Sequence, residues 1–255
     1  MNTIPSSASR NRLTILDTIR GFTLCSMILY HFLWDLVFIA GISMPWYHGT
    51  GAYIWQQCIC RTFILLSGFC WSLGKHPLKR GAIVVACSFI ISAVTCIAMP
   101  ENRVLFGVLT LIGSSMLLLF PLDKLFAGIK KPLVLFICLL LSFFLFELCR
   151  ELPYGYFAGI KLPRVLYANY FTAYLGFPAS SFYSTDYFAL LPWFPLFVAG
   201  YFLFRLLSAM NLLAGEGLKK DYLPPFTFIG RHSLFIYLLH QPILYGITLL
   251  IMKFI

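Results

Sequence analysis

The sequence predicts an all-α protein, a polytopic membrane bundle of about seven transmembrane helices forming a single integral-membrane domain over residues 1–255. Composition is the first reason. The chain is 60% hydrophobic and only 11% charged, with a mean hydropathy of +0.85, whereas about a quarter of the residues in soluble domains are charged. The second reason is that the apolar residues form long runs between short charged segments. Such runs favour helices over a β-barrel, whose strands are roughly ten residues long.

Seven apolar runs approach the roughly 20 residues that a helix needs to cross the hydrocarbon core. They cover residues 16–42, 53–73, 81–99, 104–122, 132–149, 187–210 and 228–254. Residues 165–182 are aromatic but interrupted by Gly and Pro, so we expect an interfacial helix there, or a loop that re-enters toward the site.

The Lys and Arg residues outside these runs predict how the chain is oriented in the lipid bilayer. One side collects Arg10, Arg12, Lys75, Lys79, Arg80, Lys124, Lys130, Lys131, Arg205, Lys219 and Lys220. The other side collects Arg103, Arg150, Lys161, Arg164 and Lys253. Because cytoplasmic loops are enriched in Lys and Arg, the first side should be cytoplasmic, with the N-terminus inside and the C-terminus outside.

This distribution also bears on partners. The net charge of +10 comes from short clusters between apolar runs, and no basic stretch interleaved with aromatic residues indicates nucleic-acid binding. The eight cysteines lie within or at the ends of apolar runs without metal-ligand spacing. We therefore expect packing residues, and neither a metal site nor a disulfide framework. The sequence does not determine the oligomeric state, and a homo-oligomer is one of the alternatives.

The first apolar run, "LDTIRGFTLCSMILYHFLWD", carries four ionisable side chains, Asp17, Arg20, His31 and Asp35. At 100° per residue they fall within about 60° of one another on a helix. A charge at mid-bilayer costs at least about 2.5 kcal/mol, so this face should meet protein, a partner or water. Asp17 and Arg20 can also be read simply as an i,i+3 pair that anchors the cytoplasmic end.

His31 lies roughly 21 Å along the helix from Asp17, in the outer part of the membrane. Asp35 follows at i+4, where a carboxylate can orient an imidazole. Such a pair is the geometry of a general base with its orienting acid. A hydrogen-bonded packing pair is the alternative.

Two further runs carry polar residues at comparable depth. Gln57 and Arg61 are i,i+4 neighbours in "YIWQQCICRTFILLSGF", and Arg61 could bridge to Asp35 or bind an anionic or carbonyl oxygen of a substrate. His240 stands near mid-membrane in "GRHSLFIYLLHQP", ahead of Pro242, which loosens the helix and frees a carbonyl. His240 is either a packing residue or part of a substrate path.

Arg20 and His31, with ten residues between them in the first run, resemble the first-helix motif of membrane acyltransferases that acetylate cell-surface glycans. Together with "RTFILLSGF", "STDYFALLPWFPLFVAGY" and "GRHSLFIYLLHQP", that run is similar to the small bacterial membrane proteins of the heparan-alpha-glucosaminide N-acetyltransferase catalytic-domain family. The likeness covers most of the chain. Its first-helix and last-helix motifs are specific, whereas the middle runs are generic apolar sequence.

The resemblance implies an acetyltransferase of the bacterial cytoplasmic (inner) membrane. It would move an acetyl group from cytoplasmic acetyl-CoA to an amine or hydroxyl acceptor, usually a sugar, on the outer side. Residues implied to contact CoA, by matching the motifs or by charge at the inner face, are Arg20, Lys75, Arg80 and Arg231. Residues implied to bind the acceptor are Gln57, Arg61, Asp186, Trp193 and His240. His31, with Asp35, would act as general base or acyl carrier.

A second histidine competes for the catalytic role. In the lysosomal relative of the family the active histidine is assigned to the first luminal loop, and this chain has His48 in "SMPWYHGTG". We prefer His31, because its carboxylate partner is fixed one turn away. The alternative functions are a transporter or flippase for a polar or lipid-linked substrate, and haem binding through His31, His48 or His240. Of these three, only His31 and His240 could offer a pair at matching depth.

Overall fold

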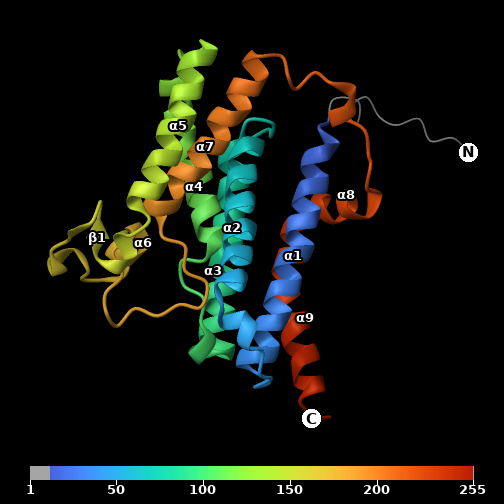
Figure 1. The fold of residues 1–255 in the computed structure, drawn as a ribbon, viewed down its shortest axis with the longest axis vertical. Coiled ribbons are helices and arrows are strands. Elements are labelled where there is room, and N and C mark those ends of the chain that lie inside the picture. Colours follow the sequence, from blue (N-terminus) through green and yellow to red (C-terminus); the bar gives the residue numbers. More distant parts are fainter. Residues whose placement is uncertain (1–11, 255) are drawn as a thin grey trace, which may run out of the picture. The chain divides into compact units, whose positions relative to one another are not determined.

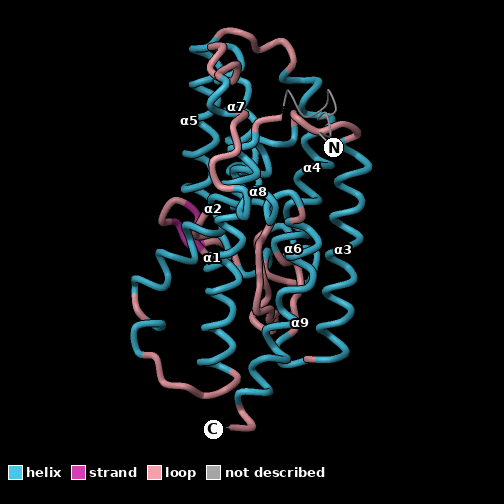
Figure 2. The backbone as a smooth tube through the Cα atoms, turned by 90° about the vertical axis from the view of Figure 1, so that its right-hand side faces the viewer, coloured by secondary structure: helices cyan, strands magenta, loops and turns pink. Residues whose placement is uncertain are grey.

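The computed structural model describes residues 12–254, so Arg10 of the orientation count lies outside the described residues. Almost all of the described chain that is not loop is helical (Figure 2), which confirms the all-α class. The chain forms two compact units. One comprises the residues up to Phe63 together with those from Asn211, and the other runs from Ile64 to Met210. A single integral-membrane domain over residues 1–255 stays a prediction.

The first unit contains α1 (Thr14–Phe38), the short helix η2 (Pro45–His48), the first part of α2 (Thr50–Trp71), η6 (Glu216–Leu218), α8 (Pro224–Arg231) and α9 (Ser233–Ile251). α1 runs beside α8 and α9 (Figure 1). Leu24 and Met27 of α1 form a buried cluster with Ile59 of α2, and residues of α8 and α9 pack against it. Chain segments about 200 residues apart therefore share one core.

Two glycines let α8 approach the backbone of α1. A Cβ added at Gly21 would fall on the carbonyl oxygen of Phe226, and one added at Gly230 would fall on that of Asp17. Small residues at a helix crossing allow this close approach inside a membrane. The side chains of Thr18 and Thr227 meet at the same crossing, 2.8 Å apart, and the Thr227 hydroxyl donates to Asp221 Oδ1 at 2.7 Å.

The predicted single span over residues 228–254 is wrong in one respect, because the helix breaks. α8 ends at Arg231 and α9 begins at Ser233, with His232 between them at φ −104° and ψ 19°. The close packing of Gly230 on α1 gives a physical reason, since it holds α8 in place before the long helix starts. The apolar pattern of residues 228–254 alone does not predict this contact with α1, which lies about 200 residues earlier in the chain.

The second unit contains the rest of α2, followed by α3 (Pro77–Ala98), η3 (Pro100–Asn102), α4 (Val108–Phe126), α5 (Pro132–Cys149), η4 (Leu152–Tyr154), β1 (Tyr156–Phe157), β2 (Ile160–Lys161), η5 (Arg164–Leu166), α6 (Tyr170–Leu175) and α7 (Leu190–Ala209). α3 packs on α4, and α7 packs on both α4 and α5. α3 and α5 both begin at a proline, where the missing N–H has no cost and φ already suits a helix.

The loop between α5 and α7 holds a hairpin that the sequence analysis did not predict. β1 and β2 pair antiparallel across Ala158 and Gly159, whose φ angles of +50° and +78° are those of a tight hairpin turn. Downstream, α6 lies within residues 165–182, where an interfacial helix or re-entrant loop is expected. It is capped by Asn169, which accepts from the backbone N–H of Thr172 while the Thr172 hydroxyl accepts from the Asn169 backbone.

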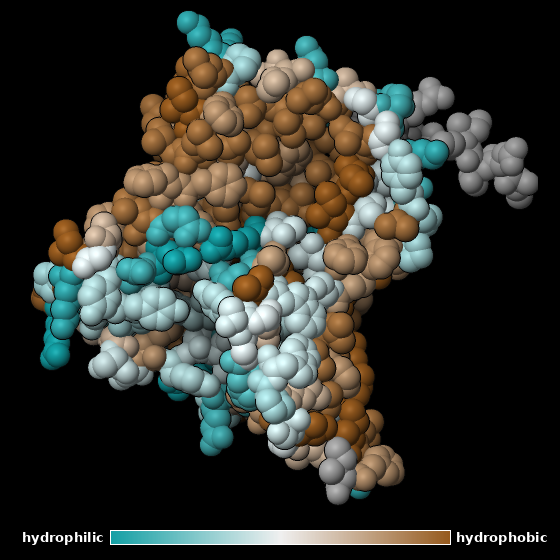
Figure 3. Space-filling model, in the orientation of Figure 1, coloured by the Kyte–Doolittle hydropathy of each residue, from teal (hydrophilic) through white to brown (hydrophobic). Residues whose placement is uncertain are grey.

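Six described helices are long and apolar enough to span a membrane, namely α1, α3, α4, α5, α7 and α9. They correspond to six of the seven predicted runs. The remaining run forms α2, which has 22 residues but is less apolar. Figure 3 shows hydrophobic side chains across the surface over α5 and α7, where Leu133, Phe136 and Phe144 are exposed. Exposed hydrocarbon of this extent indicates a lipid-facing surface, as expected of an integral membrane protein.

Candidate active site

Asp35 of α1 is fully buried and faces α9. Its Oδ1 accepts a hydrogen bond of 2.8 Å from the side-chain amide of Gln241. Its Oδ2 and the Gln241 Oε1 are both buried without a hydrogen-bond partner among the described residues. The carboxylate expected to orient His31 is therefore held by another helix, and it keeps one oxygen unused.

His31 lies beside a second imidazole, that of His240 on α9. The two ring centroids are 5.1 Å apart with the planes at 65°. His240 Nδ1 lies 2.5 Å from the backbone carbonyl of Tyr237. Because a carbonyl oxygen can only accept, Nδ1 must carry the proton, which leaves the lone pair on Nε2. That Nε2 is buried and has no hydrogen-bond partner among residues 12–254.

The segment after α1 packs aromatic rings beyond this pair. The Tyr47 hydroxyl donates to the Tyr30 carbonyl at 3.0 Å, and the two rings lie 5.1 Å apart. Burial, followed by the contact with Tyr30, raises the pKa of the Tyr47 hydroxyl far above its ordinary value, so it remains a donor. His48 is exposed, and its ring lies edge-on against Phe38 at 5.5 Å.

At the other end of α1, Asp17 is surrounded by three arginines. Arg12 makes contacts of 2.6 Å and 3.0 Å with the two carboxylate oxygens. Arg20 reaches Oδ1 at 3.3 Å, and Arg231 reaches Oδ2 at 3.6 Å. The Asp17 side chain is buried, whereas those of Arg12 and Arg231 are about half exposed. Three guanidinium groups against one carboxylate leave a formal charge of +2, so this cluster remains attractive to anions.

The structure thus brings His31, Asp35 and His240 together on two neighbouring helices, and it places Arg20 with Arg231 around Asp17. His48 belongs to the same unit but faces solvent. Gln57 and Arg61, both partly buried, lie one turn apart on the part of α2 that belongs to this unit.

The other predicted residues, Lys75, Arg80, Asp186 and Trp193, lie in the second unit. Lys75 is exposed, and the Arg80 guanidinium lies over Gly74 at the start of α3. Asp186 Oδ2 accepts from the backbone N–H of Val108 at 3.3 Å, at the first turn of α4. Trp193 packs between Phe146 and Phe188, with ring centroids 5.1 Å from each. Asp186 and Trp193 therefore both have local structural partners.

Sequence reasoning missed the partnership of Gln241 with Asp35. The signal is an amide in an apolar run, since a buried amide needs partners. For the haem alternative it singled out His31 and His240 as histidines at matching depth, but it assigned Asp35, and not His240, as the partner of His31. No group of three or more His, Cys, Asp or Glu side chains that could hold a metal ion lies in the described part of the chain.

These features define the class of protein: a helical integral membrane protein with an imidazole pair and a buried carboxylate inside one helical unit. Residues 12–242 match the family model described as "Heparan-alpha-glucosaminide N-acetyltransferase, catalytic". The chain therefore belongs to this family, which implies a transmembrane acetyltransferase. No curated protein and no solved structure was found to match it.

Proposed function

We propose that this acetyltransferase moves an acetyl group from cytoplasmic acetyl-CoA to an amine or hydroxyl of a sugar acceptor on the outer side. The observation that carries the proposal is the His31–His240 pair, which lies beside Gln241 and the buried Asp35 on a membrane-spanning helix pair. A polar cluster of this kind inside the membrane is costly, so it favours a functional role over a packing role.

In this proposal His31 is the general base that meets the acceptor. It takes the proton of the acceptor N–H or O–H as the nitrogen or oxygen attacks the thioester carbonyl. The new C–N or C–O bond forms, the C–S bond breaks, and the proton leaves with the CoA thiolate as its thiol. An acyl-histidine intermediate would divide the same transfer into two steps.

His240 replaces Asp35 as the residue expected to position His31. Its Nε2 lone pair can accept a hydrogen bond from a protonated nitrogen of His31 once the His31 ring rotates about its side-chain torsions. That bond would leave the lone pair of His31 on its other nitrogen, directed away from His240. Gln241 in turn holds Asp35 through the 2.8 Å hydrogen bond.

The arginine cluster around Asp17 supports CoA binding at the predicted cytoplasmic end. Guanidinium groups bind phosphate through paired, charge-assisted hydrogen bonds, and the cluster keeps a formal surplus of two positive charges. Arg20 and His31 are eleven residues apart, roughly 16 Å along α1. The flexible arm of CoA would span this distance to bring the thioester to His31.

The test is transfer from labelled acetyl-CoA to methyl glucosaminide by the purified protein in nanodiscs. We expect His31→Ala to lower kcat about 100-fold or more, the range for a lost general base, while the protein stays folded. His48→Ala is the matched control and should transfer at close to the wild-type rate. Full activity of His31→Ala combined with loss in His48→Ala would overturn the assignment. A well-folded protein that binds no acetyl-CoA would favour a transporter.

A further inference from the structure

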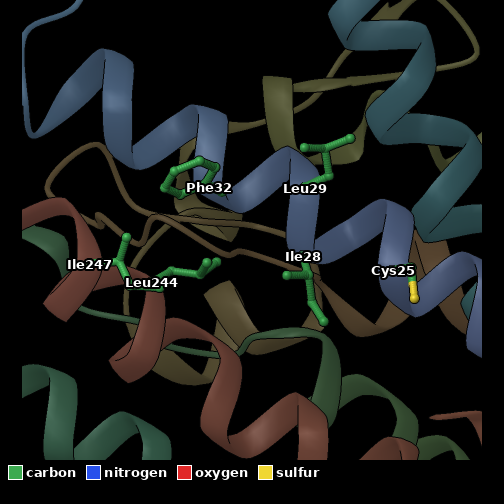
Figure 4. A pocket seen from close by; sticks show the side chains of 6 residues that line it. All are labelled: Cys25, Ile28, Leu29, Phe32, Leu244 and Ile247. Carbon is green, nitrogen blue, oxygen red and sulfur yellow. The ribbon is translucent and has the colours of Figure 1, made fainter. Parts of the chain in front are cut away.

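An apolar groove lies between the two helices that hold the histidine pair. Cys25, Ile28, Leu29 and Phe32 of α1 line one side, and Leu244 and Ile247 of α9 line the other (Figure 4). Its volume is about 390 Å³. The residues on α1 cover roughly 10 Å of helix length. We call it the α1–α9 groove.

The α1–α9 groove adjoins the polar cluster of the candidate site. Ile28 stands one turn before His31 and Leu244 one turn after His240, on the same faces of their helices as the two imidazoles. In the same cluster, the buried Asp35 Oδ2, His240 Nε2 and Gln241 Oε1 are without hydrogen-bond partners among the described residues. Because α1 and α9 run in the same direction (Figure 1), the lining lies on both sides of the histidine pair along these helices.

An apolar groove beside a polar cluster matches an amphiphile. The groove lining offers no amide, hydroxyl or charged group, so a free sugar would lose its hydrogen bonds to water there without replacement. An alkyl chain has none to lose, and it already resides at this depth in a bilayer. The polar group beside the lining is the imidazole of His31, which stands between Ile28 and Phe32, is partly exposed and suits the hydroxyl or amine of a head group.

We propose that the α1–α9 groove holds the hydrocarbon chain of a lipid-linked acceptor, and that the chain delivers its amine- or hydroxyl-bearing head group to His31. The inference rests on the proposed function and names the class of its acceptor. Because lipid tails are as apolar as the groove, the tail gains little from the hydrophobic effect. Its contribution is to orient the head group and raise its local concentration at the histidines.

The test compares two acceptors in nanodiscs, a long-chain alkyl glucosaminide and methyl glucosaminide, which share the head group. Leu29→Trp and Ile247→Trp fill the groove at positions that are 50% and 40% exposed, and Leu250→Trp, at a position 56% exposed on α9 outside the lining, is the matched control. We expect wild-type kcat/KM to be at least about tenfold higher for the alkyl acceptor. Each filling variant should lose most of that advantage and keep the methyl rate.

Direct binding of the alkyl glucosaminide, without acetyl-CoA, separates this inference from the proposed function. Tail-dependent binding that both filling variants weaken about fivefold or more, and Leu250→Trp does not, supports the groove even if no acetyl transfer occurs. Equal binding and equal rates for the two acceptors would overturn it. So would the same loss for both acceptors in the filling variants. In either case, ordinary membrane phospholipid or a second copy of the chain would be the occupant.

Discussion

The hydrogen bond from Gln241 to Asp35 gives a quantitative test of the candidate site. We consider Gln241→Met and Asp35→Leu, which keep the side-chain shapes and remove the polar atoms. Asp35 is 0% exposed, its Oδ2 has no partner among the described residues, and the 2.8 Å bond is the one that satisfies its Oδ1. A hydrogen bond to a charged group contributes about 1.5–3 kcal/mol.

Each single variant leaves a buried polar group without its partner, so each should lower the free energy of unfolding by about 1–3 kcal/mol. The double variant removes both groups and should cost much less than the sum. The coupling energy, measured by reversible unfolding in mixed micelles, should be about 1.5–3 kcal/mol. Gln56→Met, at a partly buried position on α2, is the control. Effects that add to within about 0.5 kcal/mol would mean that the two side chains do not stabilise each other.

Three further predictions concern other parts of the same unit. Gly230→Ala should destabilise the protein by about 1–3 kcal/mol, because the added methyl group overpacks on α1. Gly246→Ala, where a Cβ meets nothing within 4 Å, should stabilise it by about 0.5–1 kcal/mol. Thermal unfolding measures both changes, and equal shifts of the unfolding temperature in the two variants would contradict this prediction. Arg20→Ala should raise the Kd for acetyl-CoA about fivefold in calorimetry, which corresponds to a loss of about 1 kcal/mol. The control Arg150→Ala should leave this Kd unchanged. Equal changes of Kd in the two variants would mean that the arginine cluster does not bind CoA. Tyr47→Phe should cost about 1 kcal/mol of stability, measured by unfolding, and no loss would mean that its hydrogen bond is dispensable.

The sequence predicts the helices well where local chemistry decides them. The run over residues 132–149 coincides with α5 because a proline starts it and the apolar residues end where Arg150 begins the next loop. The other long helices differ from the predicted runs by a few residues at their ends. Charged and polar residues near a span can continue the helix beyond the apolar run, as Thr14 does in α1.

The sequence predicts which residues form the candidate site, but it does not predict which of their side chains contact one another. His31, Asp35 and His240 stand out because ionisable groups are costly in a membrane. Their i,i+4 spacing suggests that Asp35 serves His31, but that spacing shows only what one helix offers. The partner that takes Asp35 is Gln241, 206 residues further along the chain, and only the packing of α9 on α1 reveals it.

Transfer of an acetyl group across a sealed membrane is the most direct test of the proposed function. The protein would be reconstituted into proteoliposomes, with labelled acetyl-CoA enclosed on the side of the Asp17 arginine cluster and methyl glucosaminide on the opposite side. We expect labelled acetyl-glucosaminide outside the vesicles, with almost none for His31→Ala. Transfer only when both substrates share one side, or equal transfer by His31→Ala, would contradict it.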